Sequence, residues 1–445
     1  MNSVSDYIVA IDLGSSRIIG SLGEKIAGDK IRILSIKQIP VRTGVRRGVV
    51  HNIEDVSKNI MDLLDLLSKS QEKPFKIDQV FIGVNGYTIR TVDVSSTTYL
   101  SGEELVNERH LDELSDDAQS QVPDNLDVMD IFTQEFLVDG KMDIHPVGSM
   151  PQRVEGHYKI VGGKSAIMKS LEACFERIHL RYETVLGPVA SAETILRPED
   201  KSKGAVAIDF GAETTSLCIY KGNIVRYISV LPFGGNNITK DLLQLNIDEE
   251  EAERFKLGKG TAIHYTEHKN DSSETYEPEK LSDLEKDEHD ITVARIEEIV
   301  ENIWAQIRYS GIEPQKIAEG MILTGGASQL RDLAELLRKK TGMPVRIGDP
   351  GQSILSEHSE LYNKPEYAQC IGLLLLGKTG GCSVEPIMSV QTESGIPKEQ
   401  TLSGFDQETK QETKAQKPPI TTQEPKKRKK SGFNIFKDLF NEEDL

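Results

Sequence analysis

The chain has 445 residues, which is enough for two domains of ordinary size or for several subdomains. Apolar residues make up 37% of it, so a sizeable core is possible. The formal net charge of −18 argues against a nucleic-acid-binding body, because phosphate contacts need clustered Lys and Arg. Four cysteines without zinc-ligand spacing indicate a reducing compartment. No leader peptide and no apolar run of about 18 residues is present, so the sequence predicts neither a signal peptide nor a membrane-spanning helix.

A unit of one strand, an Asp-x-Gly turn and two further strands occurs twice along the chain. The apolar run 7–13 ends in a turn of sequence DLGSS, and the run 204–210 ends in DFGAETT. Each turn is followed by two strand patterns, at residues 17–22 and 30–36 in the first copy and at 216–220 and 224–230 in the second. The duplication predicts two related halves.

Between the two copies, the pattern alternates between helix and strand. Asn52 is a candidate cap for a helix whose apolar residues, from Ile53 to Leu67, recur at helical spacing. A strand is predicted at 80–84. Residues 85–164 have a mixed pattern typical of an inserted module, which is expected to contain an acidic helix near 103–119; the chain then resumes with a helix at about 165–179.

Beyond the second copy, a charged stretch at 266–290 is predicted to be a solvated loop, and a long helix is predicted at about 289–310. A strand at 320–324 leads into a Gly-Gly turn and a leucine-rich helix. An apolar closing helix is predicted at 365–377.

The composition changes after the closing helix. Residues 380–425 are rich in Gln, Glu, Thr, Ser, Pro and Lys, which predicts a disordered linker. The last segment, 426–445, begins with five consecutive basic residues and continues as a short amphipathic pattern. Because no core adjoins it in the sequence, an interfacial membrane anchor is favoured over a helix that packs onto the body. A nuclear-localisation signal and a docking peptide for a partner groove remain alternatives.

The two Asp-x-Gly turns carry the chemistry of phosphate binding. Glycine lets the backbone approach a ligand closely, and successive N–H groups can bind phosphate oxygens. An aspartate at each strand end, Asp12 and Asp209, can hold a hydrated Mg²⁺ ion. Two ordinary β-turns are the alternative for either motif alone, but the matched repeat favours a triphosphate bound from both sides.

A third glycine turn, Gly325-Gly326-Ala327-Ser328, follows a strand and can place backbone against an adenosine and its phosphates, with simple packing as the alternative. Gly162-Gly163-Lys164-Ser165 does not make a P-loop, because the first required glycine would fall at Tyr158. No serine-hydrolase elbow and no zinc-protease motif is present.

Together these motifs resemble the ATPase superfamily of actin, hexokinase and DnaK-type chaperones, and within it the FtsA family of bacterial cell-division proteins. The resemblance to FtsA rests on residues 44–56, on 233–241 (FGGNNITKD), on Glu253 to Gly258, on 320–328 and on the closing PEYAQCIGLLLLG. The basic amphipathic tail also matches. The resemblance covers about 1–378 plus the tail.

The resemblance implies a duplicated α/β actin-like fold with an inserted family-specific subdomain. It divides the chain into 1–84 and 165–203 for the first half, 85–164 for the insertion, 204–240 and 320–379 for the core of the second half, 241–319 for its outer subdomain, 380–425 for the linker and 426–445 for the tail.

The resemblance also implies ATP and Mg²⁺ as ligands. The expected nucleotide-binding residues are Asp12, Gly14, Ser15, Ser16, Arg17, Asp209, Gly211, Ala212, Glu213, Thr214, Thr215, Gly234, Gly235, Glu253, Lys256, Gly325, Gly326, Ala327 and Ser328. Asp12 and Asp209 would hold Mg²⁺ through water. The expected membrane-binding residues are Lys426, Lys427, Arg428, Lys429, Lys430, Phe433, Ile435, Phe436, Leu439 and Phe440.

The implied function is to tether the tubulin-like protein FtsZ to the cytoplasmic side of the cell membrane at the division site, through the FtsZ C-terminal peptide. Self-polymerisation and contacts with later division proteins are also implied.

Gly187 stands where active relatives carry a water-positioning side chain, which predicts slow or absent ATP turnover. A small-molecule kinase, a chaperone and a pilus-assembly scaffold of the same fold are the rivals. The tail argues against the kinase and the scaffold alternatives. The lack of a predicted substrate domain after the core argues against the chaperone alternative.

Overall fold

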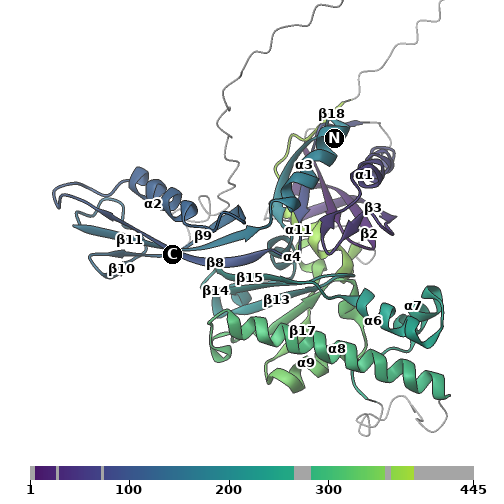
Figure 1. Cartoon of the computed structure of the whole chain (residues 1–445). Coiled ribbons are helices and arrows are strands. Elements are labelled where there is room, and N and C mark those ends of the chain that lie inside the picture. The colour runs from purple at the N-terminus through teal and green to yellow at the C-terminus, as the bar shows by residue number, and fades with distance from the viewer. Residues whose placement is uncertain (1–5, 27–29, 72–74, 265–281, 356–361, 385–445) are drawn as a thin grey trace, which may run out of the picture. The chain divides into compact units, whose positions relative to one another are not determined.

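The structure is a computed structural model, and it describes residues 6–26, 30–71, 75–264, 282–355 and 362–384 (Figure 1). The chain divides into two units, Met1–Val384 and Glu385–Leu445. The second unit, with the predicted tail and nearly all of the predicted linker, lies outside the described residues. All that follows on the fold concerns the first unit.

The first half is built on a five-stranded sheet. Its strands are β1 (Tyr7–Leu13), β2 (Arg17–Ile26), β3 (Lys30–Pro40), β7 (Gln79–Val84) and β12 (Arg181–Leu186). The order is β12-β7-β1-β2-β3. The three strands of the first sequence copy pair antiparallel, and β7 and β12 continue parallel to β1.

The second half repeats this arrangement. Its strands are β13 (Ala205–Phe210), β14 (Thr215–Lys221), β15 (Ile224–Leu231), β16 (Met321–Thr324) and β17 (Val345–Ile347). The order β15-β14-β13-β16-β17, with antiparallel and then parallel pairing, matches β3-β2-β1-β7-β12. The predicted fold class, a duplicated actin-like α/β fold, is confirmed.

Four further strands extend the sheet of the second half to nine. They are β8 (Arg90–Tyr99), β9 (Asp127–Val138), β10 (Lys141–Asp143) and β11 (Arg153–Gly163), in the order β10-β9-β11-β8. β8 joins β15 through Arg90 and Ser229. The Thr91 hydroxyl also accepts a hydrogen bond from the Ile228 N–H (2.7 Å). Helix α2 (Glu108–Ser120) packs on these strands around Leu114, and a small separate core forms.

Helices cover both sheets (Figure 1). The first half carries α1 (Ile53–Ser68) and α3 (Ala166–Ile178), and the second carries α6 (Gly235–Leu242), α7 (Glu249–Gly258), α8 (Asp283–Tyr309) and α9 (Leu333–Thr341). Helices α4 (Gly187–Ile195) and α11 (Ala368–Leu376) pack against each other between the two sheets. Their backbones are so close that a Cβ at Gly372 would lie 1.8 Å from the Ala190 carbonyl oxygen. Short elements complete the described part, namely β4 (Val45–Arg46), β5 (Val49–Val50), β6 (Phe75–Ile77), β18 (Cys382–Val384), α5 (Pro198–Lys203) and several 3₁₀ turns.

Local sequence explains where α1 begins. The Asn52 side chain accepts a hydrogen bond from the Asp55 N–H (3.2 Å), which satisfies one of the free donors of the first turn, as predicted. The apolar face of the helix is fully buried at Val56, Ile60 and Leu63. Burial of one such side chain contributes about 2 kcal/mol, so this face fixes the helix on the sheet.

Two boundary predictions are wrong. Helix α8 begins at Asp283, within the stretch predicted to be a loop, because Ser282 and Glu285 form a capping box. The turn at Gly325 opens a four-residue 3₁₀ helix (Gly326–Gln329), and the leucine-rich α-helix starts only at Leu333. The leucine spacing located the apolar face correctly but did not indicate where the α-helical turns start.

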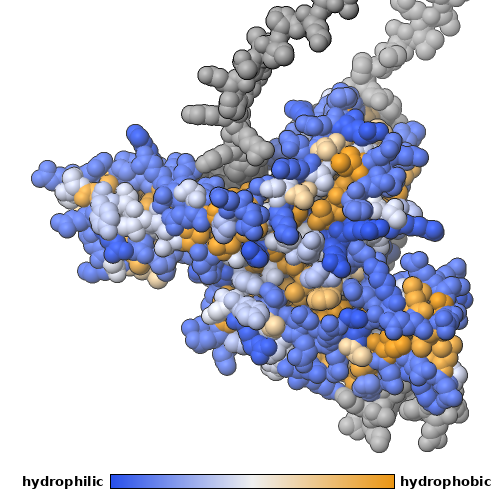
Figure 2. Space-filling model, viewed as in Figure 1, coloured by the Kyte–Doolittle hydropathy of each residue, from blue (hydrophilic) through white to orange (hydrophobic). Residues whose placement is uncertain are grey.

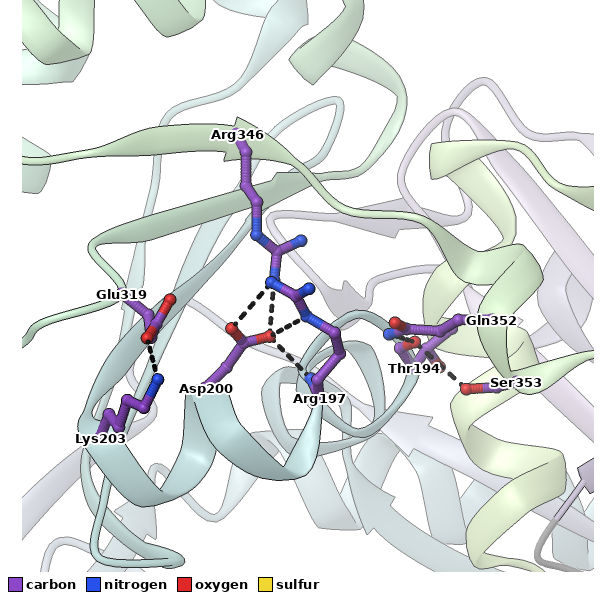
Figure 3. A network of polar contacts seen from close by, with 8 residues as sticks. All are labelled: Thr194, Arg197, Asp200, Lys203, Glu319, Arg346, Gln352 and Ser353. Carbon is purple, nitrogen blue, oxygen red and sulfur yellow. Dashed lines mark hydrogen bonds and ion pairs between the residues drawn. The ribbon is translucent and has the colours of Figure 1, made fainter.

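A buried carboxylate ties α5 to the edge strand β17 (Figure 3). Asp200 is fully buried and accepts hydrogen bonds from the Arg197 N–H (2.8 Å) and from Arg346 Nη2 (2.5 Å). Nearby, the Thr194 carbonyl accepts hydrogen bonds from Gln352 and Ser353. Removing the Asp200 carboxylate would leave two partly solvated guanidinium groups without their partner, which typically costs about 2–3 kcal/mol.

Candidate functional site

A narrow cleft of about 70 Å³ lies where β1 and β13 end. Seven residues predicted to bind nucleotide line it, namely Asp12, Gly14, Ser15, Asp209, Gly211, Ala212 and Thr214. Leu13, Gly48, Asn85, Ser216 and Gln369 complete the lining. The two duplicated turns therefore line one cleft, although they are about two hundred residues apart in the sequence.

Both turns are too tight for a side chain at their glycine. A Cβ at Gly14 would lie 2.6 Å from the Arg17 carbonyl oxygen, and one at Gly211 would lie 2.9 Å from the Thr214 carbonyl oxygen. The Gly211 N–H donates to that same carbonyl (2.9 Å). Glycine at these positions brings the backbone close to whatever occupies the cleft.

The two strand-end aspartates place negative charge on the same cleft. Burial raises the pKa of Asp12 to about 7, with a further contribution from Asp209 and an opposing one from Arg17. Burial also raises the pKa of Asp209, whose carboxylate accepts a hydrogen bond from the Ser191 hydroxyl (2.6 Å). A cation between the two carboxylates would offset this repulsion, so the donor chemistry fits a hydrated Mg²⁺ ion.

The second turn also contacts the first half directly. The Glu213 carboxylate accepts hydrogen bonds from the Arg47 N–H (2.9 Å) and from Lys240 Nζ (2.9 Å). On the other side, the Gly48 N–H donates weakly to the Ser15 hydroxyl (3.4 Å). These contacts connect the turns to the segment around β4 and β5.

The Gly234-Gly235 segment lies against the second turn. The N–H of Gly235 donates to the Gly211 carbonyl (3.0 Å), and the N–H of Asn236 donates to the Ala212 carbonyl (2.7 Å). A Cβ at Gly234 would lie 2.5 Å from the Gly211 carbonyl oxygen, so only glycine fits. The start of α6 is thereby fixed beside the cleft.

The side chains of Glu253 and Lys256 on α7 lie beside the start of α6. Lys256 Nζ donates to the Thr239 hydroxyl (2.8 Å) and to the Gly235 carbonyl (3.3 Å), and it pairs with the Glu253 carboxylate (2.5 Å). A Cβ at Gly235 would also lie 3.1 Å from the Ala327 Cβ. The motif from α7 and the third glycine turn are therefore adjacent.

The third glycine turn lies next to Asp209 and Arg17. Gly325 has a φ of +85°, and a Cβ there would lie 2.3 Å from Asp209 Oδ1. A Cβ at Gly326 would lie 3.3 Å from Arg17 Nη2. The motifs at Asp12 and Asp209 thus line one cleft. The motifs at Gly234, Lys256 and Gly325 lie beside its second turn, although five separate stretches of the chain supply the five motifs.

Some predicted site residues do not offer their side chains to the cleft. Thr215 is fully buried, and its hydroxyl donates to the Phe233 carbonyl (2.8 Å). The buried Ser328 hydroxyl donates to the Gly325 carbonyl (2.7 Å). In all, twelve of the nineteen predicted nucleotide-binding residues are absent from the lining of the cleft, namely Ser16, Arg17, Glu213, Thr215, Gly234, Gly235, Glu253, Lys256, Gly325, Gly326, Ala327 and Ser328. The ten predicted membrane-binding residues lie outside the described residues.

Sequence analysis missed three side chains beside the aspartates. Gln369 at the start of α11 donates from Nε2 to Asp12, and its Oε1 accepts from Asn85 Nδ2 (3.1 Å). Ser191 on α4 donates to Asp209. A Cβ at Gly187 would lie 2.1 Å from Asn85 Oδ1, so these amides occupy the space that a side chain there would need. Asn85 directly follows a buried strand, and this position was the one feature of the sequence that could have indicated its place beside the aspartates.

A larger cavity of about 610 Å³ lies elsewhere, between β8, β9, β11 and the end of α8. Its lining mixes acidic, basic and amide side chains, and none of the predicted nucleotide-binding residues belongs to it. The smaller cleft has the features that phosphate binding requires, namely strand-end carboxylates and glycine turns. Size alone therefore does not identify the functional site. Within the described residues, no helix is both apolar enough and long enough to cross a bilayer.

The chain is similar to known proteins in sequence and in fold. A family model described as cell division protein FtsA matches residues 206–372. The cell division protein FtsA of Neisseria meningitidis is 28% identical over 91% of this chain and 97% of its own length. The FtsA of Borreliella burgdorferi is 29% identical over 83% of this chain and 90% of its own length, and that of Escherichia coli K12 is 23% identical over 87% and 95%. A solved PilM-PilN type IV pilus biogenesis complex has a chain that is 18% identical with a TM-score of 0.59, covering 83% of this chain and 97% of that one.

Proposed function

We propose that the chain is a member of the FtsA family of cell-division proteins, that it binds ATP with Mg²⁺ and that it tethers FtsZ filaments to the cell membrane. The observation that carries the nucleotide part is that the two Asp-x-Gly turns line one cleft, with three further motifs packed beside the second turn. The tether part rests on the family and on the basic amphipathic tail, residues 426–445.

In this proposal the two turns bind the phosphates. Backbone N–H groups after Asp12 and Asp209 face the phosphate oxygens, and the two carboxylates hold water molecules of the Mg²⁺ ion. The adenosine lies against Gly235 and Ala327, with Glu253 and Lys256 beside it. Mg²⁺ supplies the charge neutralisation that lets two carboxylates and a triphosphate share one site.

We further propose that ATP serves mainly as a structural and polymerisation ligand. Gly187 has no side chain to orient an attacking water, and the nearby Asn85 and Gln369 amides already bond to each other and to Asp12. Neither amide is a strong general base. Turnover should therefore be slow.

The outer subdomain, predicted at 241–319, is the proposed docking region for the FtsZ C-terminal peptide. Figure 2 shows hydrophobic residues gathered over the area of α6 and α7. Among the exposed apolar side chains of this subdomain are Leu243 (38% exposed) and Leu257 (78% exposed). A short peptide with apolar anchors would bury such side chains and would bind more weakly than a full protein interface.

The tail is proposed to bind anionic membrane. Five basic residues, 426–430, each contribute about 1 kcal/mol near an anionic surface. The stripe of Phe433, Phe436, Leu439 and Phe440 would insert at the headgroup boundary. One such tail binds weakly, so self-association into filaments would multiply tails and raise the avidity.

Liposome co-sedimentation tests the membrane step. The full chain with ATP and Mg²⁺ should pellet with anionic liposomes, and a version truncated after Pro425 should stay in the supernatant. Phe436→Glu should abolish pelleting, because it places a charge in the apolar stripe. Asn434→Ser, at a polar position outside the apolar stripe, is the matched control and should pellet normally.

Recruitment of FtsZ is measured in the same assay. FtsZ should join the pellet only when this chain is present, and FtsZ that lacks its C-terminal peptide should not. If the full chain and the truncated version both stay soluble, the membrane role is wrong. If the chain pellets but leaves FtsZ behind, it is a membrane-bound scaffold of another assembly.

A further inference from the structure

Two histidines and one aspartate meet near the start of α8. The ligand atoms of His264, His289 and Asp290 all lie within 4.8 Å of one another. His264 Nδ1 and Asp290 Oδ1 are 3.5 Å apart. The two imidazole rings are nearly perpendicular, at 80°, with centroids 5.7 Å apart. None of the three residues lines the nucleotide cleft.

The fold positions these side chains from two separate segments. His264 follows Thr261, Ala262 and Ile263, which are buried, and the Ala262 N–H donates to the Arg331 carbonyl (2.9 Å). His289 projects from the buried face of α8 and is only 3% exposed. The arrangement is therefore set by tertiary packing and does not follow from their spacing in the sequence.

The donor set suits a transition metal of the zinc class. Imidazole nitrogen and carboxylate oxygen bind Zn²⁺ at about 2.0–2.2 Å, so neighbouring donors of a tetrahedral site lie roughly 3.4 Å apart. The His264–Asp290 separation of 3.5 Å is close to that value. Mg²⁺ and Ca²⁺ prefer oxygen donors alone, and two imidazoles argue against them.

The charges around the three residues favour a cation. Glu288 directly precedes His289, and the carboxylates of Glu251 and Glu285 lie near it. Lys259 pairs with Glu285. Acidic groups are thus crowded at the start of α8, and a bound metal ion would reduce their repulsion.

We propose that His264, His289 and Asp290 form a binding site for one Zn²⁺-class ion, with a fourth position open to water. The ion joins His264 to α8, and so braces the outer subdomain independently of nucleotide. Neutral imidazoles and an ionised carboxylate are the forms that bind a metal ion, so binding releases any protons these groups carry.

Calorimetric titration of the full, untagged, metal-free chain with Zn²⁺ in excess Mg²⁺ tests the site. One equivalent of Zn²⁺ should bind, and Co²⁺ loading should give the visible absorption of a four-coordinate ion. His264→Ala and Asp290→Asn should each weaken binding at least tenfold. Both side chains are substantially exposed (46% and 68%), so these variants should fold normally, which circular dichroism checks.

His157→Ala is a matched control, because His157 also lies between two carboxylates. Glu135 lies at its Nδ1 (3.7 Å) and Glu155 at its Nε2 (2.9 Å), so the two acids cannot share one ion with a single ring nitrogen. Zn²⁺ affinity should not change in this variant. Absence of Zn²⁺ binding in the unaltered chain, or affinity that His264→Ala leaves unchanged, would overturn the proposal.

Discussion

β1 and β13 occupy equivalent places in the two halves, and each has an aspartate as its penultimate residue and is followed by a glycine turn. The partners of the two aspartates differ. Asp12 accepts a hydrogen bond from the Gln369 amide, whereas Asp209 accepts one from the Ser191 hydroxyl. The second turn also carries Glu213, whose carboxylate accepts a hydrogen bond from the Arg47 N–H of the first half, whereas Ser15 and Ser16 follow the glycine of the first turn. Duplication has preserved the backbone of the site, and the side chains around it have diverged.

The edge strands show the same divergence. β17 is attached through the buried Asp200, while its counterpart β12 has a single side-chain hydrogen bond to β7, from Gln79 to Glu183 (2.6 Å). Equivalent places in the two sheets therefore depend on interactions of different strength. Substitutions at equivalent places should have unequal effects, and the predictions below use that inequality.

The largest difference is expected between the two edge strands. Asp200→Ala should lower the free energy of unfolding by about 2–3 kcal/mol, because a buried carboxylate that accepts hydrogen bonds from Arg197 and Arg346 is lost while the two guanidinium groups remain partly solvated. Glu183→Ala should cost only about 1 kcal/mol, the typical net value of one hydrogen bond. Urea denaturation of both variants measures the two values. Equal losses would show that the edge strands are attached equally strongly.

The second prediction concerns the proton on Asp12. A pKa raised to about 7 means that the folded, nucleotide-free chain keeps a proton that the unfolded chain releases near pH 4. Stability should therefore fall as the pH rises from about 4 to 7. Asp12→Asn removes this contribution, and it should stabilise the nucleotide-free chain at pH 8 by about 2 kcal/mol.

Denaturation curves at several pH values measure this effect. Burial also raises the pKa of Asp130 to about 7, so the difference between Asp12→Asn and the unaltered chain isolates Asp12. The exposed Asp65→Asn serves as the control, and it should change the free energy of unfolding by less than about 1 kcal/mol because it breaks only an exposed ion pair. A difference that does not vary between pH 4 and 7 would show that Asp12 is ionised throughout.

Much of this comparison could be predicted from the sequence, because each copy carries its own local signal. The Asp-x-Gly turns, the strands around them and the Asn52 cap depend on neighbouring residues. Gln369 could not be assigned to Asp12, since 357 residues separate them and nothing local marks the contact. The sequence analysis also missed that the sheet continues from β15 into β8, because that pairing joins residues far apart in the chain. It missed the start of α8 at Asp283, because the capping residues lie within a strongly charged stretch.

The third prediction compares the glycines of the two turns. Gly14→Ala would place a Cβ 2.6 Å from a carbonyl oxygen, and Gly211→Ala would place one 2.9 Å away. Both substitutions should destabilise the chain by about 1–3 kcal/mol, with Gly14→Ala the worse of the two. Thermal unfolding ranks them. Gly140→Ala is a useful reference, since its Cβ would meet no atom within 4 Å although its φ is positive.

The smallest effect is expected at the contact between the halves. Glu213→Gln keeps the size of the side chain but weakens its hydrogen bonds to Arg47 and Lys240. The expected loss is about 0.5–1 kcal/mol of stability, because Lys240 is largely exposed and solvent screens its charge. Raising the salt concentration should shrink the difference between the variant and the unaltered chain. A loss that is independent of salt would point to packing instead of charge.

Calorimetric titration with ATP tests the central claim most directly, namely that the two strand-end aspartates share one Mg²⁺-bound nucleotide. The unaltered chain should bind ATP more tightly with Mg²⁺ than with EDTA. Asp12→Asn and Asp209→Asn should each lower the affinity at least tenfold in Mg²⁺ and change it little in EDTA. Failure of the unaltered chain to bind ATP, or full affinity in both variants with Mg²⁺, would contradict the account.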